Sequence, residues 1–247
     1  MADFEEAKDR GLMGRERKSL VISETEKLTT AYHEAGHALV AHRLAEADPV
    51  HKVTIIPRGR ALGTTLQSPE EDRCHLTKRY LKSSVAILLA GRSAEEIFLN
   101  SVTTAASSDL KQVTKLARKM VCEWGMSEEL GPLNFGKNEE YVFLGREVAR
   151  HRRFSIETSI KIDQEVKKVV LDGYDQARKI LQAERKTLVR LAEALLEYET
   201  LDAHEFKAVI KGERISPAGG GVKGSDQSVD SDEVSAKEPA CAEAFPP

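Results

Sequence analysis

Two histidines and a glutamate in the stretch His33-Glu34-Ala35-Gly36-His37 have the types and the spacing that bind a catalytic metal. On an α-helix, residues four positions apart lie about one turn apart and only about 40° apart around the axis. Both imidazoles can therefore reach one Zn²⁺ ion at about 2.0–2.1 Å. The alternative is a pair of hydrogen-bonded core histidines, which the wider sequence context disfavours.

Glu34 is rotated by roughly 60–100° from the two histidines around such a helix. This places its carboxylate too far round for an easy metal ligand, but close enough to contact a water on the metal. Zinc lowers the pKa of that water, and a base must still take its proton. Glu34 is therefore the predicted general base. The small neighbours Ala35 and Gly36 predict that another backbone segment packs closely against this helix.

A catalytic zinc needs a third protein ligand and one open position. Glu95 and Glu96 follow Gly91 on a predicted second helix, where they could also be surface charges or salt-bridge partners. Asp109 follows a small polar loop at the start of another predicted helix, where an aspartate more often caps the helix or interacts with its dipole. The residue pattern favours Asp109 slightly and leaves both glutamates open.

The elements that would position these residues are mostly helices. Ser23 and Glu26 form a capping-box signature before a helix predicted from about residue 25 to 46, which Asp48-Pro49 ends. Apolar periodicity predicts further helices from residue 77 to 98 with an interruption at Gly91, from 109 to 121, and over about 154–182, 184–198 and 202–211.

Two short extended stretches lie between the first two predicted helices. Residues 50–56 are rich in β-branched side chains and stop at Pro57, and residues 62–66 are followed by Ser68-Pro69. Together they predict a small β-ribbon. The predicted fold class is therefore mainly α, a helical metallopeptidase domain with a β-ribbon beside the H-E-x-x-H helix.

Composition limits the class of protein. The 247 residues include 37 basic and 40 acidic residues, a formal charge of −3, which argues against a dedicated nucleic-acid binder. Cys74, Cys122 and Cys241 are far apart and form no C-x-x-C pair, so a reducing compartment fits best. No apolar stretch is long enough to span a bilayer, no signal peptide is recognisable, and no P-loop motif is present. The chain itself is expected to be soluble.

Several motifs together resemble the peptidase part of the FtsH-type proteases, which are membrane-anchored, ATP-dependent AAA+ zinc proteases, and the bacterial form is the most similar. The resemblance covers residues 4 to about 211. It is carried by Phe4-Glu5-Glu6-Ala7, residues 30–38, Leu62-Gly63-Thr64-Thr65, residues 90–96 and 103–110, Trp124-Gly125-Met126-Ser127 and Gly131-Pro132.

The resemblance implies one zinc ion per chain, held by His33, His37 and the aspartate of a T-T-G-A-S-N-D-L segment, which corresponds to Asp109. This chain departs from that segment at two positions. Ala105 replaces the usual glycine and Ser108 the usual asparagine. Because the ligand itself is kept, the departures concern the geometry of the loop.

The resemblance also implies a homo-hexameric ring that degrades unfolded or membrane proteins. An exposed strand around Gly63, Thr64 and Thr65 would pair with extended substrate, a mode that needs no sequence preference. The alternative is an ordinary ribbon packed on the core. Family members carry transmembrane helices and an ATPase module before the peptidase, so ATP and the membrane would reach this chain only through segments absent here. The expected location is the inner membrane of a bacterium, with the protease domain on the cytoplasmic side.

Three segments are predicted on this basis. Residues 1–20 would be a linker from the ATPase module, residues 21–215 the zinc peptidase domain, and residues 216–247 a disordered tail rich in Gly, Ser, Asp, Glu and Pro. The predicted function is that of a zinc-dependent endopeptidase. One alternative is a non-catalytic oligomerisation scaffold with a vestigial zinc, which would have no need for Glu34. A weaker alternative is a stand-alone thermolysin-like peptidase.

Overall fold

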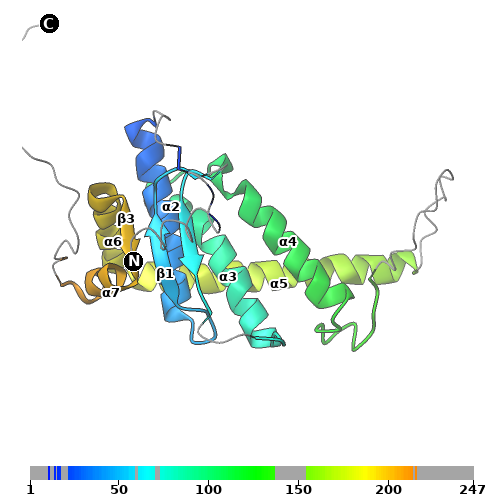
Figure 1. Cartoon of the computed structure of the whole chain (residues 1–247). Coiled ribbons are helices and arrows are strands. Elements are labelled where there is room, and N and C mark those ends of the chain that lie inside the picture. Colours follow the sequence, from blue (N-terminus) through cyan, green and yellow to red (C-terminus); the bar gives the residue numbers. More distant parts are fainter. Residues whose placement is uncertain are drawn as a thin grey trace, which may run out of the picture. The chain divides into compact units, whose positions relative to one another are not determined.

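A computed structural model describes residues 11, 14, 16–17, 22–58, 61–69, 73–136, 154–213 and 215. The predicted tail, nearly all of the predicted linker and residues 137–153 lie outside this part of the chain. Helices make up most of the described residues, which confirms the mainly-α fold class (Figure 1). They are α2 (Glu24–Arg43), α3 (Lys78–Ala94), a π-helical turn (Glu95–Leu99), a 3-10 turn (Thr104–Ala106), α4 (Ser107–Cys122), α5 (Ile156–Ala183), α6 (Arg185–Tyr198) and α7 (Ala203–Lys211).

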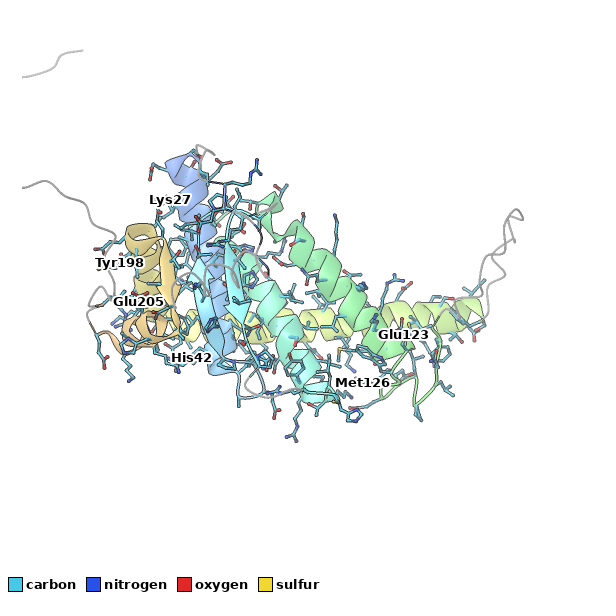
Figure 2. The ribbon with its side chains drawn as sticks, in the orientation of Figure 1. Lys27, His42, Glu123, Met126, Tyr198 and Glu205 are labelled. Atoms are coloured by element: carbon cyan, nitrogen blue, oxygen red, sulfur yellow. The ribbon has the colours of Figure 1, made fainter. Side chains whose placement is uncertain are left out.

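The H-E-x-x-H helix is α2, and it begins with the predicted capping box. The Ser23 hydroxyl accepts a hydrogen bond from the Glu26 N–H at 3.3 Å, and the Glu26 carboxylate accepts one from the Ser23 N–H at 3.3 Å. Lys27 and His42 lie toward the two ends of this helix (Figure 2). The helix ends at Arg43 rather than at the predicted residue 46, because Leu44 adopts an extended backbone and packs against the core.

A three-stranded antiparallel sheet contains β1 (Val50–Thr54), β2 (Thr64–Gln67) and β3 (Thr200–Asp202), in the order β2-β1-β3. The predicted β-ribbon is confirmed, although its second strand begins at Thr64 rather than at residue 62. The third strand was not predicted, because three residues are too few to show an alternating pattern. The sheet leaves β2 at an edge, with Thr65 opposite Val53 of the central strand.

Close packing of α2 against α3 explains the glycine in the H-E-x-x-H pattern. A Cβ added to Gly36 would lie 2.8 Å from the Ala90 carbonyl oxygen and 2.8 Å from the Ala94 Cβ. The predicted approach of a second backbone is therefore confirmed. The prediction that Gly91 interrupts the second helix is wrong, since α3 continues through it to Ala94.

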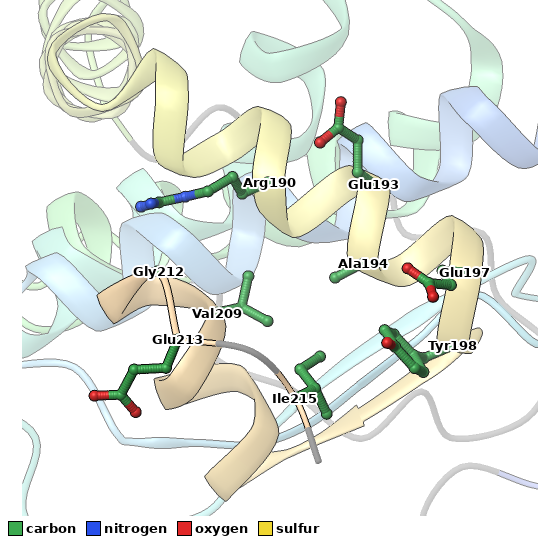
Figure 3. A pocket seen from close by; sticks show the side chains of 9 residues that line it. All are labelled: Arg190, Glu193, Ala194, Glu197, Tyr198, Val209, Gly212, Glu213 and Ile215. Atoms are coloured by element: carbon green, nitrogen blue, oxygen red, sulfur yellow. The ribbon is translucent and has the colours of Figure 1, made fainter. Parts of the chain in front are cut away.

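None of the helices in the described part of the chain combines the length and the apolar character that a membrane span requires. A surface cavity of about 400 Å³ lies on α6 and α7 (Figure 3). Arg190, Glu193 and Glu197 line it from α6, and Val209 lines it from α7. None of the residues lining this cavity belongs to the predicted metal set, whose two histidines lie on α2.

Candidate metal centre

The two histidines of α2 point their Nε2 atoms at a common point. These atoms lie 3.0 Å apart, and the rings meet edge to face. Each ring is oriented through its other nitrogen, since the Nδ1 atom of His33 lies 2.6 Å from Glu95 Oε1 and that of His37 lies 2.7 Å from the Ile87 carbonyl oxygen. An Nδ1–H that donates to oxygen leaves the Nε2 lone pair available to a metal. The arrangement therefore has the geometry expected from the i, i+4 spacing.

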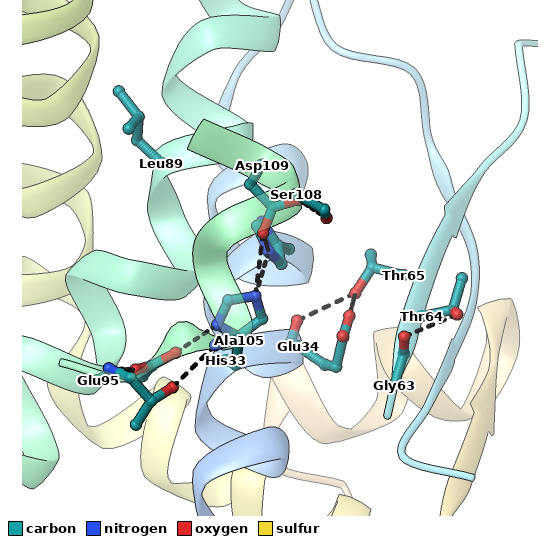
Figure 4. Close-up of polar contacts among 12 residues, drawn as sticks. His33, Glu34, Gly63, Thr64, Thr65, Leu89, Glu95, Ala105, Ser108 and Asp109 are labelled. Carbon is teal, nitrogen blue, oxygen red and sulfur yellow. Dashed lines mark hydrogen bonds and ion pairs between the residues drawn. The ribbon is translucent and has the colours of Figure 1, made fainter. Parts of the chain in front are cut away.

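Asp109 completes a group of three ligand atoms at the first turn of α4 (Figure 4). Its Oδ2 atom lies 3.3 Å from His33 Nε2 and 3.7 Å from His37 Nε2. The carboxylate is thus directed at the imidazoles and does not serve as the cap of its helix. Two imidazole nitrogens and one carboxylate oxygen are a donor set that suits zinc with one position left open.

The two glutamates that were alternative ligands lie elsewhere. Glu95 is fully buried in the π-helical turn on the far side of the His33 ring, and its Oε2 atom accepts a hydrogen bond from the Thr103 N–H at 2.9 Å. It therefore joins the His33 ring to the segment that leads to Asp109. Glu96 does not contact the histidines, and its carboxylate accepts a hydrogen bond from the Tyr174 hydroxyl.

The charges around the imidazoles favour a cation. Burial opposes a charged His33, but hydrogen bonds to the carboxylates of Asp109 and Glu95, together with nearby Glu34, raise the pKa of His33 to about 10. Burial likewise opposes a charged Asp109, yet its contacts with His33 and His37 hold the pKa of this carboxyl below its ordinary value. Carboxylates thus outnumber the imidazoles at this point, and a divalent ion would balance them.

Gly91 of α3 provides the space beside the two Nε2 atoms. A Cβ at this position would lie 2.5 Å from His37 Nε2 and 2.6 Å from His33 Nε2. The sequence signal was present, because an isolated glycine within a helical pattern can mark a close approach. From the sequence alone this glycine predicts an interruption, since nothing local indicates that α2 crosses α3 at this residue.

Gly91→Ala is expected to weaken zinc binding by at least about tenfold, because the added methyl group displaces the imidazoles as a lost supporting contact would. The change should not weaken α3 itself, since alanine favours a helix by about 1 kcal/mol over glycine. Zinc titration with a competing chelator measures the affinity. Gly173→Ala is the matched control. It adds the same methyl group to a helical glycine, but that methyl group would meet the Val85 side chain at 2.6 Å rather than the imidazoles, so its zinc affinity should equal that of the wild type. Equal zinc affinity in the Gly91 variant and the wild type would contradict this role.

Glu34 turns from α2 toward the start of β2. It is buried, and its Oε2 atom accepts a hydrogen bond from the Thr65 hydroxyl at 2.7 Å. A Cβ on Gly63 would lie 2.8 Å from Glu34 Oε1, so glycine leaves room for this carboxylate. The Thr64 hydroxyl instead donates to the Gly63 carbonyl oxygen at 2.7 Å. Two of the three residues predicted to contact substrate thus lie against the predicted base.

Ala105 and Ser108, which depart from the family segment before Asp109, do not prevent the Asp109 carboxylate from facing both histidines. Ala105 lies in the 3-10 turn, and its N–H donates to the Thr103 hydroxyl at 3.2 Å. Ala105 is not among the described residues with a positive φ angle, so the position does not require glycine. The Ser108 hydroxyl lies 3.4 Å from Asp109 Oδ1, on the carboxylate oxygen that does not face the histidines.

Comparison with known proteins gives consistent matches over this region. Residues 20–209 match peptidase family M41. Proteins named ATP-dependent zinc metalloprotease FtsH are similar in Acidobacterium capsulatum (54% identity over 88% of this chain and 34% of that protein) and Magnetococcus marinus (54%, 88% and 32%). The protein of that name in Thermotoga maritima is 48% identical over 86% of this chain and 35% of its own length. The chain spans about a third of the length of these relatives.

Proposed function

Since the chain belongs to peptidase family M41, we propose that it is a zinc-dependent endopeptidase in which His33, His37 and Asp109 hold one zinc ion and Glu34 is the general base. The observation that carries the proposal is the convergence of the three ligand atoms, within 4.8 Å of one another, on a point left open by Gly91. A donor set of two imidazoles and a carboxylate fits a catalytic zinc.

Each residue has a separate part in peptide hydrolysis. Bound zinc supplies Lewis acidity, which polarises a carbonyl group and makes a water more acidic. The Glu34 carboxylate takes the proton of the attacking water and passes it to the amine that leaves. Glu95 and the Ile87 carbonyl keep the imidazole rings in the orientation that presents Nε2.

Edge strand β2 is the proposed binding site for extended substrate, through Gly63, Thr64 and Thr65. Its place at the edge of the sheet supports this role, because an edge strand can add one more strand by main-chain hydrogen bonds. The contact between Thr65 and Glu34 also supports it, since a peptide paired with β2 would lie beside the base. This mode would accept unfolded polypeptides of many sequences.

The wider setting is proposed from the resemblance and from the names of the relatives. We infer that residues 21–215 form the peptidase domain of an ATP-dependent, membrane-anchored protease, with residues 1–20 as a linker and residues 216–247 as a tail. It would act on unfolded or membrane proteins as a homo-hexamer on the cytoplasmic side of a bacterial inner membrane. Contacts with ATP and with the membrane would come from other segments of that protein.

Removal of the metal tests the proposed function. The chain is expected to contain about one zinc ion and to cleave a short fluorogenic peptide, which needs no unfolding. Chelation should remove the zinc and the cleavage together, and added zinc should restore both. A chain that binds zinc and cleaves neither short peptides nor unfolded casein would instead support the non-catalytic scaffold.

A further inference from the structure

The Thr65 hydroxyl joins the edge strand β2 to the carboxylate of Glu34. Its Oγ1 atom lies 2.7 Å from Glu34 Oε2 and 3.2 Å from the Glu34 carbonyl oxygen. A hydroxyl has one proton to donate, and the shorter contact goes to the group that carries charge. Figure 4 shows this side chain directed from the strand toward α2, on the side of Glu34 away from the metal ligands.

Gly63 restricts the same carboxylate from a second side. A Cβ added to Gly63 would lie 2.7 Å from Glu34 Cγ and 2.8 Å from Glu34 Oε1. The strand backbone therefore packs directly against this side chain. With Oε2 bonded to the Thr65 hydroxyl and Oε1 beside Gly63, the strand holds the carboxylate on two sides.

We propose that Thr65 is a positioning residue for the general base, so that the strand that binds substrate also sets the orientation of Glu34. This inference rests on the proposed function. A glutamate side chain has several rotatable bonds, and proton transfer depends on its placement. A displacement of about 1 Å can lower a rate roughly 100-fold. The Thr65 hydrogen bond selects one placement before substrate arrives.

The position of Thr65 in the sheet makes this coupling specific. Its backbone pairs with Val53 of β1, and alternation along the strand directs its side chain to one face while Thr64 and Leu66 point to the other. A peptide added to the edge of β2 that faces away from β1 would order the backbone that carries the Thr65 hydroxyl. Substrate binding and alignment of the base would then depend on one short strand.

Thr65→Val and Thr65→Ser separate the hydroxyl from the shape of the side chain. Valine keeps the volume and removes the hydrogen bond, whereas serine keeps the hydroxyl. Cleavage of a fluorogenic peptide should show kcat lowered roughly 10- to 100-fold in Thr65→Val, with zinc content and KM close to wild type. Thr65→Ser should stay within about threefold of the wild-type kcat.

Thr54→Val is the matched control, because it also removes a threonine hydroxyl, but from the neighbouring strand β1. The partners of the Thr54 hydroxyl are Thr200, the Glu199 carbonyl oxygen and the Ile56 N–H, and Glu34 is not among them. Its kcat per zinc-loaded chain should be unchanged. If Thr65→Val does not fold, Thr65→Ala provides the same comparison with serine. A wild-type kcat without the hydroxyl, an equal loss in Thr65→Ser, or a change confined to KM would overturn the proposal.

Crystal structures provide a readout that does not depend on activity. The Glu34 carboxylate should leave its wild-type position in zinc-loaded Thr65→Val and keep it in Thr65→Ser. An unchanged carboxylate in the valine variant would overturn the proposal. A wild-type chain that binds zinc but does not cleave the peptide would instead count against the proposed function. The crystallographic comparison would still decide whether Thr65 positions Glu34.

Discussion

Glu34→Gln is expected to lower kcat for peptide cleavage by about 100- to 10,000-fold while leaving the bound zinc in place. Glutamine keeps the shape of the side chain and can still accept the Thr65 hydrogen bond through its oxygen. It cannot take a proton from water, because an amide is not a base at neutral pH. Zinc content by metal analysis and the kcat of the fluorogenic peptide are the two measurements.

Glu96→Gln is the matched control for this variant. Glu96 lies in the π-helical turn after α3, and its carboxylate contacts Tyr174 and Arg178 rather than the metal ligands. The same chemical change at that position should leave kcat near wild type. A Glu34→Gln chain that retains zinc and cleaves at the wild-type rate would contradict the assignment of the base.

Asp109→Ala is expected to weaken zinc binding by more than about 100-fold, since loss of a direct ligand should cost more than the 10- to 100-fold typical of a supporting residue. Its Oδ2 atom lies against both imidazoles, and alanine leaves only the two nitrogen ligands. Zinc affinity measured against a competing chelator checks the prediction. Loss of metal should also remove peptide cleavage.

Glu95→Gln provides the comparison that the sequence left open. Glutamine has a single acceptor oxygen, so it can keep the hydrogen bond from His33 or the one from the Thr103 N–H, but not both. Zinc affinity should therefore fall by about 10- to 100-fold, as for a supporting residue, which is less than in Asp109→Ala. The reverse order would contradict the ligand set. Zinc kept in Asp109→Ala and lost in Glu95→Gln would make Glu95 the third ligand.

Local sequence signals were sufficient to predict most of the helices and the two histidines of the metal site. The capping box at Ser23 and the spacing of His33 and His37 act within one or two turns of a helix, where periodicity is informative. The mainly-α fold and the β-ribbon followed from the same kind of pattern. The end of α2 was placed too late, because Leu44 leaves the helix to pack against the core.

The rest of the site depends on contacts between distant residues. Asp109 meets His33 across 76 positions of the chain, and its residue type alone is equally suited to a helix N-terminus. The sequence leaves Glu95 as one of three acidic candidates for the third metal ligand. In the structure the π-helical turn places its carboxylate against His33 Nδ1, the nitrogen that faces away from the proposed metal position. Gly91 indicated an interruption until its contact with the imidazoles was visible. The roles of Gly91 and Glu95 come from the crossing of α2 and α3, and that of Asp109 comes from the packing of α4 against α3. No local pattern encodes either contact.

Diffraction data collected at the zinc absorption edge would locate the metal and identify its ligands. Crystals of the zinc-loaded chain should show one anomalous peak, at about 2.0–2.2 Å from His33 Nε2, His37 Nε2 and a carboxylate oxygen of Asp109, with Glu34 beside it but not bound to it. A peak bound by Glu95 in place of Asp109, or a peak away from the two histidines, would contradict the account.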